Sequence, residues 1–401
     1  MNKIAFLLLS TISLAQSVTK SIALLPDTGQ TNSYTSTFGE DHDYSINPPS
    51  FTNNGNGTIT DNVTGLMWQQ ADDGEMIYEN AGPFCDALSY AGYTDWRLPS
   101  PMESFSILNL QNNNPSLNTT FFTTSTAEYW WTNKAQVGDN TKVWCTNAGG
   151  GIGNKPKAET ISAGGAFKYH TRCVRDVATP NVIQNHFTDN GNGTITDNLT
   201  QLVWQKVPNP NILSWEQAIS YAEGLSLASF SDWRLPNIKE LQSLNDESVS
   251  NPSVNSTFFG TLGVHNYWSS TTLKPNTANP ASAWYWSTQL GITTYDLKTN
   301  SNYVICVRGI PTLNSDEFSV EDNIKIYPNP ASNFINLYFP KELNTVQIAI
   351  TDTLGKIVYS KTVKSSLNEY KIDSKDFSDG IYYINIINEN SKKAYKVIIK
   401  K

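Results

Sequence analysis

The stretch FTNNGNGTITDNVTGLMWQ at residues 51–69 occurs a second time, with few changes, as FTDNGNGTITDNLTQLVWQ at residues 187–205. In both copies an Asn-Gly-Asn-Gly turn lies between segments rich in Thr, Ile and Val, a pattern that predicts a β-hairpin. Further motifs follow in the same order in both copies, from Asp-Trp-Arg-Leu-Pro to Cys-Val-Arg. The chain therefore contains a duplicated, domain-sized unit, with repeat 1 at residues 49–176 and repeat 2 at residues 185–310.

Each repeat also carries the start signals of two helices. In repeat 2 the first helix is expected to begin at Ser214, with Gln217 three residues later. In repeat 1 the second helix follows Asp-Trp-Arg-Leu-Pro, where Ser100 and Glu103 have the capping-box spacing. Capping also accounts for Glu240 in repeat 2, so neither glutamate is assigned to general acid catalysis. Two helices before a strand-rich second half predict an α+β fold for each repeat.

The N-terminal residues have the pattern of an export signal. Lys3 precedes an apolar run at residues 4–14, and Ser-Leu-Ala at residues 13–15 offers a cleavage site. We expect a signal peptide at residues 1–15, with a buried first strand or helix as the alternative. The run is too short to anchor the chain in a bilayer, and no later stretch has the length of a transmembrane segment. The expected segments between the domains are a lead-in at residues 16–48 and linkers at residues 177–184 and 311–320.

The C-terminal part differs in composition from the repeats, because Lys becomes frequent and Trp disappears after Ile324. Residues 346–351 and 356–360 predict strands on either side of a turn, and residues 381–387 and 394–399 predict another hairpin. Several short strands in so few residues predict a small all-β sandwich at residues 321–401.

The ordered motifs of the two repeats resemble one bacterial family, which includes the C-terminal domain of the collagen-like adhesin Lcl. The resemblance rests on the repeated hairpin, on DWRLP and the glutamate four residues after it, on YWSST at residues 267–271, on Cys-Val-Arg, and on LPDTGQ at residues 25–30. It implies two C-type-lectin-like domains in tandem, a fold shared with formylglycine-generating proteins. It also implies binding of a polysaccharide or glycoconjugate.

The tail carries a second resemblance. IYPNPAS at residues 326–332, DTLGK at 352–356, GIYY at 380–383 and KVIIK at 396–400 resemble the type A sorting domain of type IX secretion. The resemblance implies an immunoglobulin-like sandwich, recognition by the type IX secretion machinery, removal of the tail and display at the outer cell surface. An ordinary immunoglobulin-like domain is the alternative.

The charge of the chain limits its partners. The net charge is −8, and residues 51–176 hold 8 Lys and Arg against 12 Asp and Glu. Residues 187–309 hold 6 against 9. Such acidic domains are poorly suited to nucleic acid or to sulfated polyanions. The sulfated polysaccharides that the collagen-like adhesin binds are therefore not expected as ligands here.

Aromatic residues suggest where a glycan would bind. Their rings, beside Asn and Thr, suit the C–H faces and hydroxyls of sugar rings. Within a strand Trp284 and Trp286 would share one face and Tyr285 the other. For any single Trp, core packing is favoured over exposure to a ligand. We call the candidate residues the aromatic band: Tyr129, Trp130, Trp131, Trp144, Tyr267, Trp268, Trp284, Tyr285 and Trp286.

No catalytic or metal-binding pattern stands out. The four His are expected at the surface, since neither His170 nor His265 has a His at the matching position of the other repeat. The Asn-rich turns offer oxygens to calcium but lack the spacing of an EF-hand. We therefore predict no catalytic residue, no metal and no cofactor, in a secreted binding protein of the outer cell surface or extracellular space. The alternatives are an enzyme of the formylglycine-generating class and a purely structural surface protein.

The four cysteines divide unequally between the copies. Cys85 lies in the first helix of repeat 1, where repeat 2 has Ala222. An exported chain can form disulfides, and the strand that follows Cys173 is expected to close the domain beside that helix. We therefore expect a Cys85–Cys173 disulfide. Cys145 and Cys306 are expected to remain thiols, with a bridge between them as the alternative.

Overall fold

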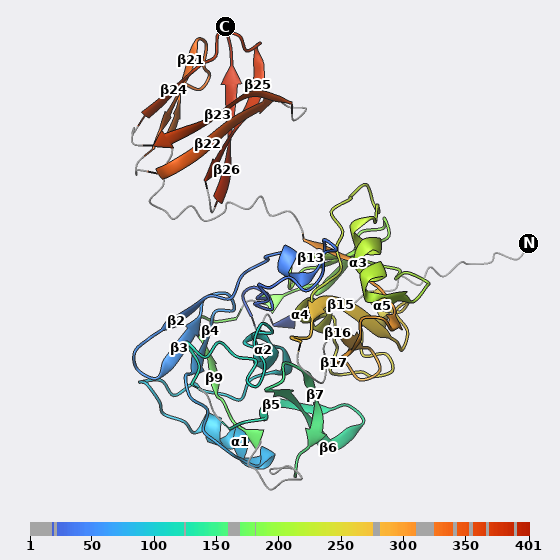
Figure 1. Cartoon of the computed structure of the whole chain (residues 1–401). Coiled ribbons are helices and arrows are strands. Elements are labelled where there is room, and N and C mark those ends of the chain that lie inside the picture. Colours follow the sequence, from blue (N-terminus) through green and yellow to red (C-terminus); the bar gives the residue numbers. More distant parts are fainter. Residues whose placement is uncertain are drawn as a thin grey trace, which may run out of the picture. The chain divides into compact units, whose positions relative to one another are not determined.

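The structure is a computed structural model, and it describes residues 18–19, 22–123, 126–158, 169–180, 182–275, 281–309, 325–339, 343–352, 356–365, 369–388 and 391–401 (Figure 1). The chain forms two compact units, residues 1–310 and residues 311–401. The expected signal peptide and the linker at residues 311–320 lie outside the described residues. Both repeats belong to the first unit.

The described residues of repeat 1 form two sheets and two short helices. Its first sheet has the order β2-β3-β4-β9, and its second has the order β7-β6-β5-β8. The elements are β2 (Phe51–Asn53), β3 (Thr58–Asp61), β4 (Leu66–Gln69), α1 (Tyr78–Asp86), α2 (Pro101–Ser106), β5 (Tyr129–Gln136), β6 (Asp139–Asn147), β7 (Ile152–Pro156), β8 (Tyr169–His170) and β9 (Val174–Asp176).

Repeat 2 follows the same order of elements, with the short strand β14 and the short helix α5 added. Its sheets are β11-β12-β13-β19, β15-β16-β17 and the short pair β14-β18. The elements are β11 (Phe187–Asp189), β12 (Thr194–Asp197), β13 (Leu202–Gln205), β14 (Leu213–Ser214), α3 (Trp215–Glu223), α4 (Ile238–Ser243), α5 (Ser256–Phe259), β15 (Asn266–Thr272), β16 (Ser282–Ser287), β17 (Ile292–Leu297), β18 (Ser301–Asn302) and β19 (Val307–Gly309). In each repeat the last strand pairs with the third strand of the hairpin sheet, which closes the domain.

The local signals of the sequence form the structures that they predict. Gly55 and Gly57 take positive φ in the first hairpin turn, and the Asn54 amide bonds the hydroxyls of Thr58 and Thr60. The polar side chains of the turn are therefore hydrogen-bonded to one another and stabilise the hairpin. The capping boxes at Ser100 and at its counterpart in repeat 2 are also present.

The Asp-Trp-Arg-Leu-Pro motif holds each repeat together through ion pairs. Arg97 donates two hydrogen bonds of 2.8 Å to the carboxylate of Glu103, the same group that caps α2. Asp95 accepts from Arg175 of the Cys-Val-Arg strand at 2.7 Å. Repeat 2 repeats both pairs, Arg234 with Glu240 and Arg308 with Asp232. The motif therefore joins helix, loop and closing strand.

The two repeats share a core. One continuous apolar cluster contains Trp68 and Phe105 of repeat 1 together with Trp204 and Leu241 of repeat 2, all at most 1% exposed. The helices α2 and α4 contact each other, as do strands β7 and β17. Strands make up 38% of the structure and helices 11%, so the fold is richer in β structure than the α+β prediction implied.

The second unit consists of two antiparallel sheets with an apolar core between them. The sheets have the orders β20-β21-β24 and β23-β22-β25-β26. Ile335 and Ile372 of one sheet and Ile348 and Ile384 of the other are buried in this core. The strands are β20 (Lys325–Tyr327), β21 (Phe334–Tyr338), β22 (Leu343–Asp352), β23 (Ile357–Ser365), β24 (Glu369–Asp373), β25 (Gly380–Asn388) and β26 (Ser391–Ile399).

The lead-in segment is an integral part of the first unit. Ala23 and Leu24 donate backbone hydrogen bonds to Thr64 and Val63 of repeat 1. Residues 27–47 then form a loop, closed at its base by the hydrogen bond from Asp27 N to Asn47 O. We call residues 27–47 the strap. It contains the short 3-10 helix η1 (Asp41–Asp43), and its middle contacts repeat 2. Strands β1 (Val18–Thr19) and β10 (Val182–Ile183) also pair, which joins the lead-in to the connection between the repeats.

Candidate functional site

Most of the aromatic band lies in the protein interior. Trp131, Tyr267, Trp268 and Trp286 are 0% exposed, and only Tyr129 and Tyr285 are half-buried. The remaining buried residues are Trp130, Trp144 and Trp284. The expectation of an exposed band assumed that one face of these strands meets solvent, but β15 is buried along both faces. Most of the band therefore stabilises the cores of the two repeats.

Two residues of the band do reach a pocket, which lies between the repeats. Tyr129 and Trp284 line a pocket of about 620 Å³. Repeat 1 contributes the loop at residues 113–115, the start of β5 and the end of β6, and repeat 2 contributes β16 and β17. The full lining comprises Asn113, Asn114, Pro115, Ala127, Glu128, Tyr129, Asn147, Ala148, Gly149, Leu273, Trp284, Thr293, Thr294 and Tyr295.

A glycine turn of repeat 1 shapes this inter-repeat pocket. A Cβ atom at Gly150 or Gly151 would lie 3.3 Å from the ring of Trp284, so only glycine allows the turn to pass so close. The Asn147 side chain accepts hydrogen bonds from Gly149 N and Gly151 N and fixes the turn. Ile152 N then donates to the Thr293 hydroxyl across the boundary between the repeats, at 2.9 Å.

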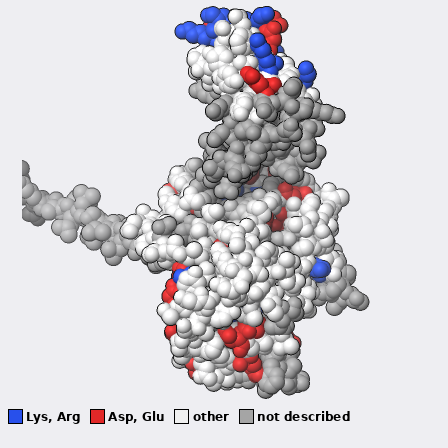
Figure 2. Space-filling model, turned by 90° about the vertical axis from the view of Figure 1, so that its left-hand side faces the viewer, with Lys and Arg blue, Asp and Glu red and all other residues white. Residues whose placement is uncertain are grey.

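The pocket offers aromatic rings, amides and hydroxyls with little charge. Tyr295 is 43% exposed, and its ring meets that of Trp284 edge-on at 5.8 Å. Glu128 is the one Asp, Glu, Lys or Arg among the described residues that line the pocket. The two repeats carry more Asp and Glu than Lys and Arg, and on the first unit the face in view in Figure 2 shows more red than blue. Tyr295 was not among the candidate residues, because it lies outside the Trp-rich motifs.

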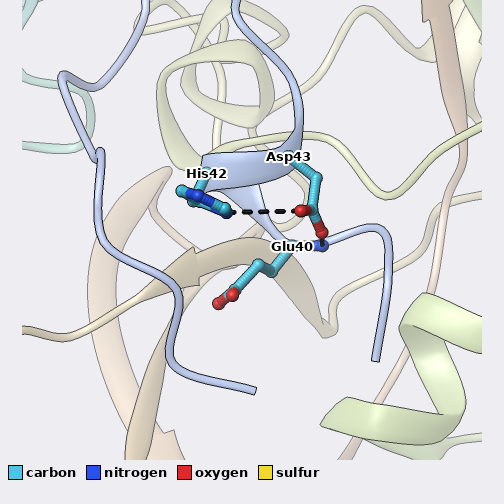
Figure 3. Close-up of side chains that lie close together, drawn as sticks. All are labelled: Glu40, His42 and Asp43. Carbon is cyan, nitrogen blue, oxygen red and sulfur yellow. Dashed lines mark hydrogen bonds and ion pairs between the residues drawn. The ribbon is translucent and has the colours of Figure 1, made fainter. Parts of the chain in front are cut away.

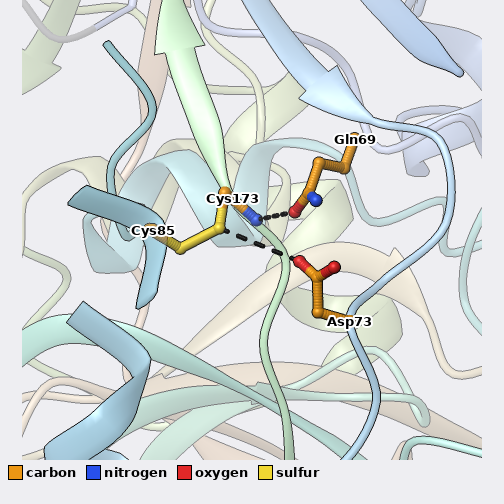
Figure 4. Close-up of a disulfide and its surroundings, with 4 residues drawn as sticks. All are labelled: Gln69, Asp73, Cys85 and Cys173. Carbon is orange, nitrogen blue, oxygen red and sulfur yellow. Dashed lines mark hydrogen bonds between the residues drawn. A yellow bond between two sulfur atoms is a disulfide. The ribbon is translucent and has the colours of Figure 1, made fainter. Parts of the chain in front are cut away.

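The disulfide joins the residues that the sequence analysis paired. Cys85 in α1 is bonded to Cys173, which immediately precedes β9 (Figure 4). Cys173 N donates to the Gln69 side chain at 2.7 Å, so the bridge is also tied to β4. Cys145 and Cys306 remain thiols, and they lie in separate apolar clusters.

A buried polar cluster in repeat 1 was not foreseen. His170 was expected at the surface but is 4% exposed, and its Nδ1 lies 2.9 Å from Asp72. Asp72 also accepts from the indole N–H of Trp130 at 3.0 Å. Arg172 donates to the backbone of Gln69, and burial lowers the pKa of its guanidinium to about 10. The cluster fixes the chain that enters the closing strand. In repeat 2 the positions of His170, Arg172 and Trp130 are occupied by Tyr303, Ile305 and Tyr267.

The strap brings Glu40, His42 and Asp43 together in a group that could offer three ligands to a metal (Figure 3). Backbone hydrogen bonds account for this arrangement. Asp43 accepts from Gly39 N and Glu40 N at the start of η1, and Glu40 accepts from Tyr34 N. The carboxylates thus serve the turn, and we assign no metal to them.

Two further acids of the strap are buried against repeat 2. Asp41 accepts hydrogen bonds from Thr28 at 2.8 Å and from Thr271 at 2.6 Å. Burial raises its pKa to about 8, and the nearby carboxylate of Asp27 adds to this effect. Lys239 donates from Nζ to the backbone oxygens of Asp27 and Ser106, and burial lowers its pKa to about 8. This lysine thereby links the strap, α2 and α4.

Comparison with known families identifies both parts of the chain. A model of the Lcl C-terminal domain matches residues 57–175 and again residues 193–308. The chain belongs to the Lcl C-terminal domain family. A model of the secretion system C-terminal sorting domain matches residues 325–400. Comparison with curated proteins gave no match.

These matches confirm both resemblances and the location of this tandem Lcl C-terminal protein. The type IX sorting domain directs it to the cell surface or the extracellular space. In the described part of the chain, no helix has the length and apolar character of a membrane span. Neither matched family is an enzyme family.

Proposed function

We propose that this protein is a non-enzymatic adhesin of the cell surface that binds a neutral or weakly charged polysaccharide or glycoconjugate, and that the inter-repeat pocket binds it. The pocket carries the proposal because it combines aromatic rings with amides and hydroxyls. Family membership and the sorting domain support a surface role. We also propose a C-type-lectin-like fold for each repeat and an immunoglobulin-like fold for the tail.

The lining of the pocket suits a sugar chain. The ring of Tyr295 presents an apolar face on which the C–H face of a pyranose can pack. Asn113 and Thr294 place an amide and a hydroxyl beside it, and such groups form hydrogen bonds with sugar hydroxyls. A pocket of about 620 Å³ can hold a short oligosaccharide. One carboxylate and no Lys or Arg among its described lining residues disfavour a sulfated ligand.

A glycan array probed with the full-length protein tests the proposal. We expect binding to neutral or weakly charged glycans, and Tyr295→Ala to weaken it about tenfold or more, a loss of about 1.4 kcal/mol. Tyr295→Phe keeps the ring and should retain most of the affinity. Trp284→Ala and Trp286→Ala are unsuitable because both rings are buried.

Phe38→Ala is the control, since Phe38 is an exposed aromatic residue outside the pocket. Equal loss of binding in Phe38→Ala and Tyr295→Ala would count against this site. Tight, salt-sensitive binding of heparin would show that the charge argument is wrong. An absence of glycan binding would favour the purely structural alternative. The formylglycine-generating alternative requires a catalytic Cys pair or a metal, whereas Cys145 and Cys306 lie in separate clusters.

A further inference from the structure

The surface of α1 in repeat 1 is hollow. A groove of about 280 Å³ lies between α1 and the loop that follows Trp96. Gly82 lies in its wall, where a Cβ atom would meet nothing within 4 Å. Glu79 and Asp86 of α1 also line the groove, as do Arg97 and Asn133.

The same surface of repeat 2 is occupied by the strap. Thr35 donates from its hydroxyl to Glu216, the counterpart of Glu79, at 2.8 Å. The Tyr44 hydroxyl donates to Glu223, the counterpart of Asp86, also at 2.8 Å. The strap thus contacts both ends of α3, the helix of repeat 2 that matches α1.

The centre of the strap contacts the positions that match the groove. Gly39 lies against Ile219, the counterpart of Gly82, so closely that a Cβ atom on Gly39 would be 2.8 Å from it. The ring of Tyr44 lies over the guanidinium of Arg234, the counterpart of Arg97, at 5.4 Å. As a result the Arg234 side chain is 5% exposed, whereas that of Arg97 is 31% exposed.

In the described residues of the connection before repeat 2 there is no second strap. Only residues 177–186 separate β9 from β11, against residues 27–47 in the strap alone. The strap itself is held at its base by the Asp27–Asn47 hydrogen bond and anchored to repeat 1 at Ala23 and Leu24. Exchange of straps between two copies would have to break these contacts.

We infer that the groove of repeat 1 binds a peptide segment of a partner protein with the chemistry of the strap. A glycine of the segment passes over Gly82, and a tyrosine five residues later covers Arg97 and donates its hydroxyl to Asp86. A second hydroxyl donates to Glu79. The strap on repeat 2 supports a peptide over a sugar, because it is a peptide that occupies the matching surface.

A synthetic peptide of residues 33–46, carrying a fluorophore, is the probe. Titration into the full-length protein should give saturable binding with Kd below about 1 mM. The same peptide with Tyr44→Ala should bind about tenfold more weakly or worse. In the protein, Asp86→Lys should weaken binding by a similar factor, and Gly82→Trp, which fills the groove, should abolish it.

The charge-matched control is Asp376→Lys, at an exposed position of the second unit, and it should bind the peptide like the original protein. Tyr295→Ala should also leave peptide binding unchanged, which separates this inference from the proposed glycan pocket. Three results would overturn it: no saturable binding up to about 1 mM, undiminished binding in Asp86→Lys and Gly82→Trp, or displacement of the peptide by a neutral oligosaccharide. Circular dichroism of each variant verifies that it is folded.

Discussion

At the scale of single residues, a few side chains and glycines decide how distant segments meet. Gly150 and Gly151 allow a turn of repeat 1 to touch Trp284, and Gly39 allows the strap to touch α3. Lys239 joins three segments through two backbone oxygens. Such contacts have no signature in the local sequence, because each depends on a partner far along the chain.

Gly39→Ala should detach the strap from repeat 2. Gly39 has φ of +115°, and a Cβ atom would lie 2.7 Å from Glu223. Strain and overpacking together should lower the free energy of unfolding by about 2–4 kcal/mol. Gly55→Ala is the matched control, because Gly55 also has positive φ but open space around it, and should cost only about 1 kcal/mol. Chemical denaturation measures both, and equal losses would refute the role of the strap contact.

At the scale of elements, the hairpins, capped helices and closing strands could be predicted from the sequence because their signals are local. The hairpin at Asn54 and the box at Ser100 need only a few residues each. The alignment of the repeats showed that Cys85 of the first helix is Ala222 in repeat 2. The expected position of the closing strand beside that helix then gave Cys173 as its disulfide partner. The strap could not be predicted, since Asp41 meets Thr271 across 230 positions. Which members of the aromatic band are exposed could not be predicted, because strand periodicity does not reveal that both faces of β15 are covered.

The attachment of the strap should depend on pH through Asp41. Burial raises the pKa of this carboxyl from 3.8 to about 8. A carboxyl with a raised folded-state pKa stabilises the fold most when protonated, and this contribution is lost as the pH rises from the unfolded value through the folded one. The free energy of unfolding should therefore fall between about pH 4 and pH 8. In Asp41→Asn, which still accepts from Thr28 and Thr271, the fall should be smaller.

Asp139→Asn is the control for this pH dependence, because Asp139 lies at a turn outside the strap and hydrogen bonds from Thr141 and Lys142 lower its pKa. Denaturation midpoints should be compared across the pH range for the original protein and both variants. An identical slope in Asp41→Asn and the original protein would contradict the assignment.

The disulfide should contribute much of the stability of repeat 1, since it ties α1 to the closing strand. It spans 88 residues, for which the chain-entropy model gives about 4–5 kcal/mol as an upper guide. The double variant Cys85→Ala/Cys173→Ala should lose a large part of this free energy of unfolding. Cys306→Ala, which removes a buried thiol without a bridge, should cost about 1 kcal/mol. Non-reducing peptide mapping provides the direct check, and a Cys85–Cys145 peptide would contradict the pairing.

At the scale of the whole molecule, the duplicated repeats form one compact unit and the tail is a sorting signal. The tail matches the sorting domain over residues 325–400 and forms a compact unit of its own. Deletion of residues 311–401 in the native host should therefore leave the first unit folded but trapped inside the outer membrane. Cell fractionation with antibody detection measures this, and normal surface display of the truncated chain would disprove the sorting role.

The shared core predicts that the two repeats unfold together. Trp68 and Phe105 of repeat 1 belong to the same buried cluster as Trp204 and Leu241 of repeat 2. Separation of the repeats would expose this apolar surface to water, at a free-energy cost of about 25 cal/mol per Å². The strap adds to this coupling, because the residues before it are bonded to repeat 1 at Thr64 and Val63 and the strap itself packs on repeat 2. We expect residues 16–310 to show one cooperative thermal transition, with equal calorimetric and van't Hoff enthalpies.

Residues 185–310 expressed alone should lack that transition and should bind a hydrophobic dye, because their half of the core and the surface under the strap are uncovered. Addition of the strap as a peptide should cover only the surface that the strap contacts, and should leave the half of the core exposed. Two separate transitions in residues 16–310, or a stable isolated repeat 2, would show that the core is divided between independent domains. A pocket formed by both repeats would then open whenever they separate, and glycan binding would have to compete with that separation.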